Sequence, residues 1–370
     1  MKSISQNMVI CYFGDSESIH LVKWASHFQG LGNDVHVISF KEKPVPGVTH
    51  HFLNAGNINQ KGGNFKVLFT FRALRKLLEK IKPDVLHAHY ATSYGITAAL
   101  TGFHPLVISA WGSDVLVSPQ KSFLLKNLLR LALGRADIVT VVAPHMQRAL
   151  DSLNVAKSKQ RVITHGIRKE VFYQTENTRD KHTFTCVSTR HLEPIYNPFF
   201  ILEAFAAFSK LHENVQLLLV GEGSLKTGLQ AYCEENGMQD KVHFLGRQSQ
   251  VELARTLNLS HVFLTLSNSD GDVVSMVEAM ACGCVCIGSD IPANRYWITP
   301  SENGFLVPLG EVATFIETLN HTYKHHQELK AKYDVLNKKI IEEKGNWEFN
   351  MNAALKVYND LLKEKTHLKA

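Results

Sequence analysis

The chain has 370 residues, of which 45% are hydrophobic and 20% are charged. This composition is ordinary for a folded globular protein, and it excludes collagen-like, coiled-coil and intrinsically disordered classes. No stretch approaches the roughly 20 consecutive apolar residues of a membrane-spanning helix. The length corresponds to about two or three domains.

Charge divides the chain into two unlike halves. Residues 1–168 contain 20 Lys and Arg against 9 Asp and Glu, a net charge of +11. Residues 169–370 contain 20 against 25, a net charge of −5. We therefore predict two domains with different partners, the first of which prefers something anionic.

The first half alternates β-rich runs with amphipathic segments, beginning with a strand too short for a signal-peptide core, so the expected location is the cytosol. The predicted strands are Met8–Phe13, Asp34–Phe40, Asp84–His87, Leu106–Ala110, Asp137–Val142 and Arg161–Thr164. Apolar residues recur at helical spacing in segments 19–31, 67–81 and 123–133.

The second half repeats this alternation after the polar, aperiodic segment 168–183, which we predict to be a linker. The predicted strands are Phe184–Ser188, Val215–Val220, Lys241–Leu245, His261–Leu266 and Cys284–Gly288. The predicted helices are Pro198–Lys210, Leu225–Asn236, Gln250–Asn258, Val274–Cys282, Val312–Leu336 and Trp347–Lys363.

Strands that alternate with helices predict parallel sheets. The expected fold is α/β, with two facing Rossmann-like domains, residues 1–167 and 184–345, and an interdomain cleft. We expect a C-terminal helix, 346–370, to cross back to the first domain. The six cysteines lack paired Cys-x-x-Cys spacing and are expected to be reduced core residues: Cys11, Cys186, Cys233, Cys282, Cys284 and Cys286.

The segment Ser267–Ile291 is the most informative for chemistry, because it is predicted as strand, loop, helix and strand. Asp270 lies in the loop and Glu278 lies eight residues later in the helix. Free amides at the start of that helix attract phosphate, and a carboxylate can accept hydrogen bonds from ribose hydroxyls. An N-terminal capping Asp followed by a solvated Glu is the simpler alternative.

The motifs of the whole chain resemble the retaining glycosyltransferases of family 4 (glycosyl transferases group 1), which have the GT-B fold. Asp270-Gly271-Asp272-Val273, followed after four residues by Glu278-Ala279-Met280-Ala281-Cys282-Gly283, resembles the family's acid, Gly-Phe-Gly, four residues and Glu-Ala-Met-Ala-Cys-Gly. Further elements match in order: Asp84–His89, Gly112-Ser113-Asp114, Thr164–Ile167, Leu218–Ser224, Val242–Arg247 and Asn303–Val307.

The resemblance implies transfer of a sugar from a nucleotide-sugar donor with retained anomeric configuration, without a cofactor. Arg190, Asp270 and Glu278 would be the catalytic residues, binding phosphate, donor sugar and ribose respectively. The leaving phosphate would itself accept the acceptor's proton. The implied donor-binding residues are Arg190, Asn197, Gly223, Arg247, Asp270, Gly271, Asp272, Val273, Val274, Ser275 and Glu278.

Three departures from the family pattern bear on activity. The Lys that often follows the Arg is absent, and Tyr196-Asn197 occupy its place, which leaves a CMP-linked donor open beside a diphosphate-linked one. The family's active-site His is Trp111 here. Asp272 replaces the Phe and is expected to place a second carboxylate near the sugar. Asp270-x-Asp272 also matches a short metal motif of another fold, but we expect no metal site.

The acceptor is expected on the first domain. The candidate residues for that side are Gly14, Asp15, Ser18, His20, His89, Trp111 and Asp114. Ser18 is expected to cap a helix. Of His87 and His89, one is expected to face the core and the other the cleft.

Basic residues of the first half concentrate in Lys66–Lys82 and Lys121–Arg135, the second of which also contains bulky apolar residues. This pattern is typical of helices that lie on an anionic membrane surface, or of an ordinary solvated helix. The sequence contains no nucleic-acid-binding signature.

We therefore predict a cytosolic, peripherally membrane-associated retaining glycosyltransferase. It would extend a surface glycan (of the lipopolysaccharide, O-antigen or capsule type) on a lipid-linked or polysaccharide acceptor. Another GT-B enzyme, such as a sugar-nucleotide epimerase, and a non-catalytic nucleotide-binding subunit are the alternatives.

Overall fold

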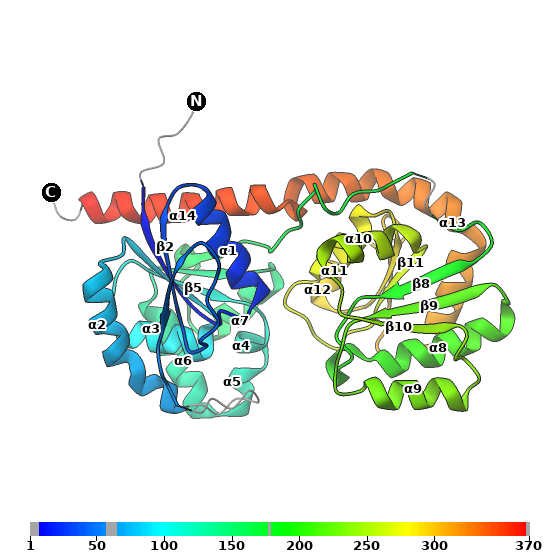
Figure 1. Ribbon diagram of the computed structural model, residues 1–370, viewed down its shortest axis with the longest axis horizontal. Coiled ribbons are helices and arrows are strands. Elements are labelled where there is room, and N and C mark those ends of the chain that lie inside the picture. The colour runs from blue at the N-terminus through cyan, green and yellow to red at the C-terminus, as the bar shows by residue number, and fades with distance from the viewer. Residues whose placement is uncertain (1–6, 57–64, 177–178, 368–370) are drawn as a thin grey trace. The chain divides into compact units, whose positions relative to one another are not determined.

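The computed structural model describes residues 7–56, 65–176 and 179–367 of the chain. Its contacts divide the chain into two compact units (Figure 1). The first unit comprises Met1–Thr164 with Met351–Ala370, and the second comprises His165–Asn350. The chain therefore passes between units twice, at 164–165 and at 350–351.

The described residues of the first unit form a seven-stranded parallel sheet in the order β3-β2-β1-β4-β5-β6-β7. At its centre, Ile10 pairs with Val35 on one side and Val85 on the other. The strands are β1 Val9–Phe13, β2 Asp34–Ser39, β3 Thr49–Phe52, β4 Val85–His89, β5 Leu106–Ala110, β6 Ile138–Val141 and β7 Gln160–Val162.

Helices cover both faces of this sheet, so neighbouring residues of one strand are both buried. Cys11 and Phe13 pack into the cluster formed with α2, α3, α6 and α7. Tyr12 points to the other face, where its ring lies 6.4 Å from Phe28 of α1. The helical elements are α1 Ile19–Gly30, η1 Phe65–Thr70, α2 Phe71–Ile81, η2 Ala91–Gly95, α3 Ile96–Leu100, α4 Ser113–Leu116, α5 Ser118–Lys121, α6 Phe123–Arg135, α7 His145–Ser152 and η3 Lys157–Lys159. The helix α14 Trp347–His367 begins in the second unit and belongs to the first from Met351 onward.

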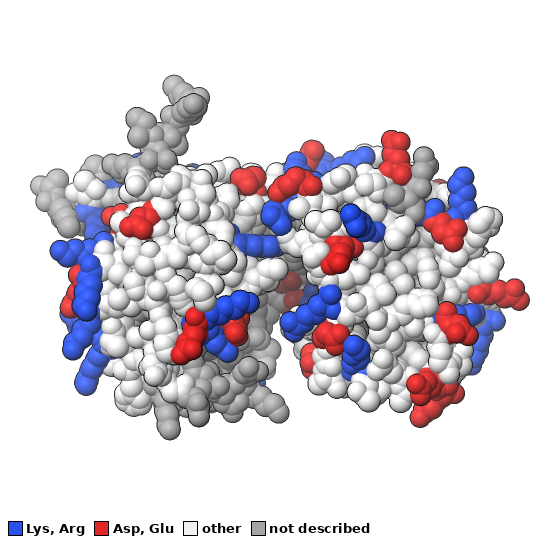
Figure 2. All heavy atoms as spheres, in the orientation of Figure 1, with Lys and Arg blue, Asp and Glu red and all other residues white. Residues whose placement is uncertain are grey.

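The outward side of α2 is basic. Arg72, Arg75, Lys76 and Lys80 are all exposed, and Lys and Arg side chains gather at the edge of the molecule where α2 lies (Figure 2). The opposite side of α2 buries Leu74 and Leu78 in the core. The helix is therefore amphipathic, with a cationic outer face.

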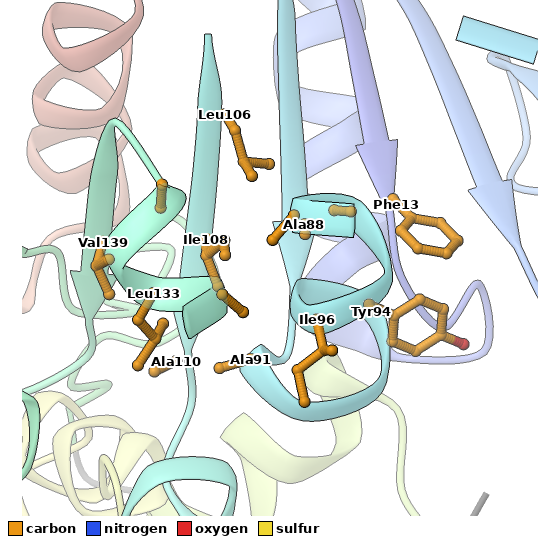
Figure 3. Close-up of a cluster of buried hydrophobic side chains, with 14 of the residues drawn as sticks. Phe13, Ala88, Ala91, Tyr94, Ile96, Leu106, Ile108, Ala110, Leu133 and Val139 are labelled. Atoms are coloured by element: carbon orange, nitrogen blue, oxygen red, sulfur yellow. The ribbon is translucent and has the colours of Figure 1, made fainter. Parts of the chain in front are cut away.

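The core of the first unit fills the space between the sheet and α3 and α6 (Figure 3). Ile108 and Val139 come from adjacent strands, and Leu133 of α6 packs against them. At the other end the ring of Phe13 meets Tyr94 edge-on at 5.0 Å. This packing fixes the strand ends from which the site loops emerge.

The described residues of the second unit form a six-stranded parallel sheet in the order β10-β9-β8-β11-β12-β13. Its faces again alternate: Cys186 packs with α8, α9 and α13, and Val187 packs with α10 and α11. The strands are β8 Phe184–Ser188, β9 Val215–Val220, β10 Val242–Gly246, β11 Val262–Thr265, β12 Val285–Ser289 and β13 Phe305–Val307. The helical elements are η4 Pro194–Tyr196, α8 Pro198–Leu211, α9 Lys226–Glu235, α10 Gln250–Leu259, α11 Val274–Ala281, α12 Pro292–Arg295, α13 Val312–Ile340 and η5 Ile341–Gly345.

The segment predicted as a linker packs closely within the second unit where it is described. Phe172 is buried in that unit's core, the Thr175 amide donates to Asn258 Oδ1 at 2.8 Å, and Arg179 Nη2 donates to the Cys282 carbonyl at 2.8 Å. Just before it, the Ile167 amide donates to the Gly345 carbonyl at 2.8 Å. Gly166, with φ +65°, passes so close to Trp347 that a Cβ would lie 2.8 Å from its nitrogen.

The predicted strands and long helices are confirmed, with ends that differ by a few residues. Two strands were missed: β3, a half-exposed run of Thr, His and Phe at one edge, and β13, which has three residues. All six cysteines are buried free thiols, as expected.

Candidate functional site

The residues predicted to bind a donor lie on loops at one edge of the second sheet. Arg190 follows β8, Gly221 and Gly223 follow β9, Arg247 follows β10 and Asp270 follows β11. Because the strands are parallel, their carboxyl ends share this edge, which is where open α/β sheets bind ligands.

Arg190 is the centre of the polar contacts at this edge. Its Nη2 is ion-paired with Asp270, and its Nη1 donates to the Ser275 hydroxyl at 3.0 Å. The ring of Tyr196 lies 4.3 Å from the guanidinium carbon, a cation–π contact. The structure therefore brings together the predicted phosphate cation, the predicted sugar acid and the first turn of α11.

Two glycines allow the turn after β9 to approach the loop that carries Arg190. A Cβ on Gly221, whose φ is +141°, would lie 2.8 Å from the Arg190 carbonyl. A Cβ on Gly223 would overlap the backbone of Leu192. The amides of Leu192 and Leu225 close the contact by donating to the carbonyls of Glu222 and Leu192 at 3.1 and 3.0 Å. The loop position of Arg190 thus depends on the absence of side chains at both positions.

The start of α11 presents backbone amides. The first hydrogen bonds back into the turn are donated by Met276 and Val277 to the Val273 carbonyl, so the amides of Val274 and Ser275 precede the helical ladder. Val273 occupies the N-cap position and provides no capping side chain. These two amides lie at the positive end of the helix dipole and can donate hydrogen bonds to a bound anion.

Glu278 lies one turn further along α11 and is 7% exposed. It is held among buried residues of the same helix, including Met276 and Met280. A carboxylate in this position is a fixed acceptor rather than a solvated surface charge.

Asp270 and Asp272 point to different partners, although they are two residues apart. Burial raises the pKa of Asp270, and the neighbouring Arg190 acts in the opposite direction. Asp272 is buried and turned inward: its Oδ1 accepts from the indole of Trp297 at 3.0 Å and its Oδ2 accepts from the His165 amide at 3.2 Å. The expectation that Asp272 places a second carboxylate beside the sugar was wrong, because both its oxygens are engaged inside the unit.

Asn197, predicted to bind the donor, contacts the neighbouring strand end in the structure. Its side-chain amide donates to the Leu266 carbonyl at 3.0 Å and to Asn268 Oδ1 at 2.6 Å. These bonds join the start of α8 to the end of β11, so Asn197 braces the loop behind Arg190. Arg247 is exposed just beyond β10, and Gly271 donates its amide to Asp270 Oδ1 at 3.0 Å.

The candidates on the acceptor side gather at the carboxyl edge of the first sheet. Gly14 ends β1, and a Cβ there would lie 3.1 Å from the His89 Cβ. The ring of Trp111 meets those of His20 and His89 edge-on at 5.4 and 5.1 Å. Three of the seven predicted residues, His20, His89 and Trp111, therefore form one aromatic group at this edge, and Gly14 lies beside it.

Asp15 and Ser18 shape the turn before α1. The Glu17 amide donates to Asp15 Oδ1 at 2.9 Å, and the Ser18 amide donates to the Asp15 carbonyl at 3.0 Å. Ser18 stands at the N-cap position, but its side chain makes no capping hydrogen bond to the helix. The predicted capping role is therefore wrong for its hydroxyl.

Both histidines of β4 are buried on the same face, with ring centroids 4.4 Å apart. The expectation that one faces the core and the other the cleft was wrong, because residues i and i+2 of a strand share a face. His87 is bonded on both sides, to Tyr358 at 2.6 Å and to Ser109 at 2.7 Å.

Asp114 organises the loop around Trp111 from beneath. Its two oxygens accept the amides of Ala91, Gly112, Val115 and Trp111 at 2.7 to 3.3 Å. The carboxylate is completely buried, which raises its pKa. Asp114 therefore holds the loop and does not face the acceptor side, in contrast to the prediction.

Sequence reasoning missed Tyr196 and Trp297. Tyr196 was noted only as the occupant of the missing Lys position, and that position could have indicated a contact with Arg190. Trp297 follows α12, 25 residues after its partner Asp272. No local pattern links the two.

Within residues 7–56, 65–176 and 179–367, no group of three or more His, Cys, Asp or Glu side chains is arranged to hold a metal ion. Over the same described residues, no helix combines the length and apolarity that a bilayer crossing requires.

Comparison with known families gives two matches in sequence order. The family described as "Glycosyl transferase 4-like" matches residues 9–143, and the family "Glycosyl transferases group 1" matches residues 170–338. The second match includes Arg190, Asp270 and Glu278.

The curated relatives include enzymes that are named as glycosyltransferases. N-acetyl-alpha-D-glucosaminyl L-malate synthase of Bacillus anthracis is 27% identical over 246 residues, which is 62% of each chain and so less than two thirds of that enzyme. D-rhamnosyltransferase WbpZ of Pseudomonas aeruginosa is 25% identical over 80% of each chain. UDP-Gal:alpha-D-GlcNAc-diphosphoundecaprenol alpha-1,3-galactosyltransferase of Escherichia coli is 25% identical over 67% of this chain and 68% of its own.

Solved structures share the fold over nearly the whole chain. Sucrose-phosphate synthase from Thermosynechococcus elongatus superposes with a TM-score of 0.80 at 17% identity, covering 96% of this chain and 100% of the other. HepE of Anabaena, in complex with UDP-glucose, gives a TM-score of 0.75 at 16% identity, covering 97% and 99%.

Proposed function

Because the chain belongs to the group 1 glycosyltransferases and has the GT-B fold of two Rossmann-like domains, we propose that it transfers a sugar from a nucleotide-sugar donor with retention of anomeric configuration. The donor would bind at the carboxyl edge of the second sheet. The acceptor would bind at the corresponding edge of the first. Family membership favours a transferase over an epimerase or a non-catalytic subunit.

The observation that carries this proposal is the contact of Arg190 with both Asp270 and Ser275. A cation, a carboxylate and the amide end of α11 lie within one hydrogen-bonded group. That combination suits a ligand that has an anionic phosphate beside a hydroxyl-bearing sugar.

In the proposed reaction the acceptor hydroxyl attacks the anomeric carbon from the side on which the phosphate leaves. The bond from that carbon to the phosphate oxygen breaks, and the phosphate accepts the hydroxyl proton. Arg190 and the amides of Val274 and Ser275 stabilise the charge that develops on the leaving oxygen. Asp270 holds the donor sugar and Glu278 holds the ribose hydroxyls, so no side-chain base is required.

We propose UDP as the nucleotide of the donor, ahead of CMP. The E. coli relative uses UDP-Gal by its name, and the Anabaena structure of the same fold contains UDP-glucose. Arg190 is the cation at the α11 end, and Tyr196 stands where a second cation is common in the family. A CMP-linked donor is therefore the second candidate.

The acceptor is proposed to be a lipid-linked or polysaccharide glycan of the cell surface. The E. coli relative acts on a diphosphoundecaprenol-linked sugar, and the Pseudomonas relative is a rhamnosyltransferase, by their names. Trp111 is half-buried and is contacted edge-on by His20 and by the buried His89, so its indole offers a ring face of the kind that packs against sugar rings.

We further propose that the first unit touches an anionic membrane surface, at the inner face of the membrane. The helix α6 exposes Phe123 and Leu124, at 80% and 60%, close to Lys121 and Lys126. Phe69, two residues before the start of α2, is 78% exposed. Bulky apolar side chains beside cations are the features of interfacial helices.

Transfer from UDP-sugars to a lipid-diphosphate-linked saccharide tests the proposal, with Arg190→Ala as the critical variant. Loss of a charged hydrogen-bond partner predicts a fall in kcat/KM of about 10- to 100-fold. Arg255→Ala, at an exposed position of α10, is the matched control and should retain activity. Equal activity of the Arg190 variant and the control would contradict the proposed donor site.

A further inference from the structure

The loop 270–273 holds Asp270 at one end and leads into the amides of α11 at the other. Asp272 lies between them and is 9% exposed. Its two oxygens accept hydrogen bonds from Trp297 Nε1 and the His165 amide, at 3.0 and 3.2 Å. These hydrogen bonds join three separate segments of the second unit in its interior.

Trp297 is itself a fixed partner. It is 1% exposed, its amide donates to the Asn294 carbonyl at 3.0 Å, and its carbonyl accepts from Asn303 Nδ2 at 2.8 Å. Its ring also lies 5.1 Å from the ammonium of Lys344. A loop bonded to this indole is therefore bonded to the buried core of the unit.

The loop needs such an anchor because α11 has no capping side chain at Val273. Asp270 cannot both anchor the loop and remain available to a sugar. Asp272 supplies the anchoring hydrogen bonds from the adjacent position, directed inward.

We propose that Asp272 is a positioning residue, whose ionised carboxylate holds the loop 270–273 against Trp297 and His165 so that Asp270 and the α11 amides are preorganised for the donor. This inference rests on the proposed function, since it assigns the loop to donor binding. It adds a residue that does not touch the donor and acts through its neighbours.

The ionised form is the one that fits both contacts. Each oxygen faces an N–H, so a proton on either oxygen removes one acceptor and one hydrogen bond. Burial raises the pKa of Asp272 to about 7, and the charge of Asp270 acts in the same direction. The other titratable groups that sense it are Lys344 of η5 and Tyr296, which follows α12. Donor affinity should therefore decrease as the pH falls through about 7.

The test measures UDP-glucose binding by calorimetry at about pH 8 and about pH 6, in the wild type and in Asp272→Asn. UDP-glucose is the probe because its diphosphate gains no proton over this range. The asparagine keeps the shape but offers one acceptor in place of two. We expect wild-type affinity to fall about ten-fold between the two pH values. The variant should be about ten-fold weaker already at the higher pH, with little further change. Asp240→Asn, at an exposed acid before β10, is the control and should behave as the wild type.

A second measurement needs no ligand. The Trp297 indole N–H resonance, assigned with Trp297→Phe, should shift with a midpoint near pH 7 in the wild type and not in Asp272→Asn. In binding, the effects of Asp272→Asn and Trp297→Phe should be less than additive, because they remove the same contact.

The outcomes separate the inference from the function it rests on. If the wild type does not bind UDP-glucose at either pH, the proposed donor is overturned and the inference with it. If the wild type binds and Asp272→Asn binds equally well with the same pH dependence, the positioning role alone is overturned. If the Trp297 indole resonance does not titrate, the claim that an ionised Asp272 carboxylate holds the loop is overturned.

Discussion

The side chains of His87 and Tyr358 share a buried hydrogen bond of 2.6 Å, which joins β4 to α14 within the first unit. The two residues are 271 positions apart in the chain. The same tyrosine hydroxyl lies 3.3 Å from that of Tyr12 in β1. A residue near the C-terminus is thus part of the polar interior behind the predicted acceptor edge.

Tyr358→Phe removes this hydroxyl and leaves His87 Nδ1 buried without its partner. We expect the free energy of unfolding to fall by about 1–3 kcal/mol, measured by thermal or urea unfolding. Tyr173→Phe, at a tyrosine that is 55% exposed, is the matched control and should change stability little. A Tyr358 variant as stable as the control would show that the bond contributes nothing.

The pH dependence of stability follows from the same histidine. Burial lowers the pKa of His87 from 6.5 to about 3, so the unfolded chain binds a proton that the folded chain does not. The contribution of His87 to the free energy of unfolding is complete above about pH 6.5. It is lost as the pH falls below that value, by up to about 1.4 kcal/mol per pH unit. The raised pKa of Asp272 changes stability with pH in the opposite direction. Because this effect is the same in the wild type and in a His87 variant, it does not alter the difference between them.

The measurement is the unfolding free energy of the wild type and of His87→Gln between about pH 7.5 and about pH 5. The wild type should lose stability more steeply with acidification than the variant. Parallel slopes in the two proteins would mean that His87 is not the group that titrates.

Gly223→Ala tests the close approach of the β9 turn to the loop of Arg190. The new methyl would overlap the Leu192 backbone, which cannot move without moving Arg190. We expect nucleotide affinity to fall by at least about ten-fold, as measured by calorimetry. Gly134→Ala, in α6, has open space around it and should be neutral. Unchanged affinity in the Gly223 variant would place the nucleotide elsewhere.

Asp114→Ala tests the loop around Trp111. It removes the acceptor of four backbone amides, three of them buried, and we expect a loss of about 2–4 kcal/mol in unfolding free energy. Asp240→Ala is the control at an exposed acid. A loss no larger than that of the control would contradict the loop-organising role.

Vesicle co-sedimentation tests the membrane surface of the first unit. Binding should require phosphatidylglycerol, weaken at high salt, and decrease in the double variant Phe123→Ser, Leu124→Ser. Leu211→Ser, at an exposed residue of α8 in the second unit, is the control. Equal binding to neutral vesicles, or no binding at all, would contradict a membrane-facing α6.

The sequence predicted both parallel sheets, the loops that carry Arg190 and Asp270, and the helix that carries Glu278, because strand and helix periodicities alternate clearly and polar motifs follow the strands. It could not predict β3 or β13. A half-polar edge strand and a three-residue strand lack the apolar run by which buried strands are recognised.

The sequence also could not predict the direction in which the polar side chains of these motifs point. Asp272 and Asn197 lie in the predicted motifs, yet each bonds to partners that local spacing does not identify. The partner of Asp272 is Trp297 and that of His87 is Tyr358, both brought close only by the packed fold. Such contacts depend on tertiary packing, so a motif identifies the loop but not the role of each residue within it.

The most direct test of the account is a thermal-shift comparison of the wild type with UDP, GDP, ADP, dTDP and CMP. Ligand at about 100 times its dissociation constant adds about 2.7 kcal/mol of stability, a shift of several degrees. The account predicts a shift with UDP that Arg190→Ala abolishes and Arg255→Ala retains. A shift with CMP alone would redirect the donor to monophosphate-linked sugars, and no shift with any nucleotide would contradict a donor site at the carboxyl edge of the second sheet.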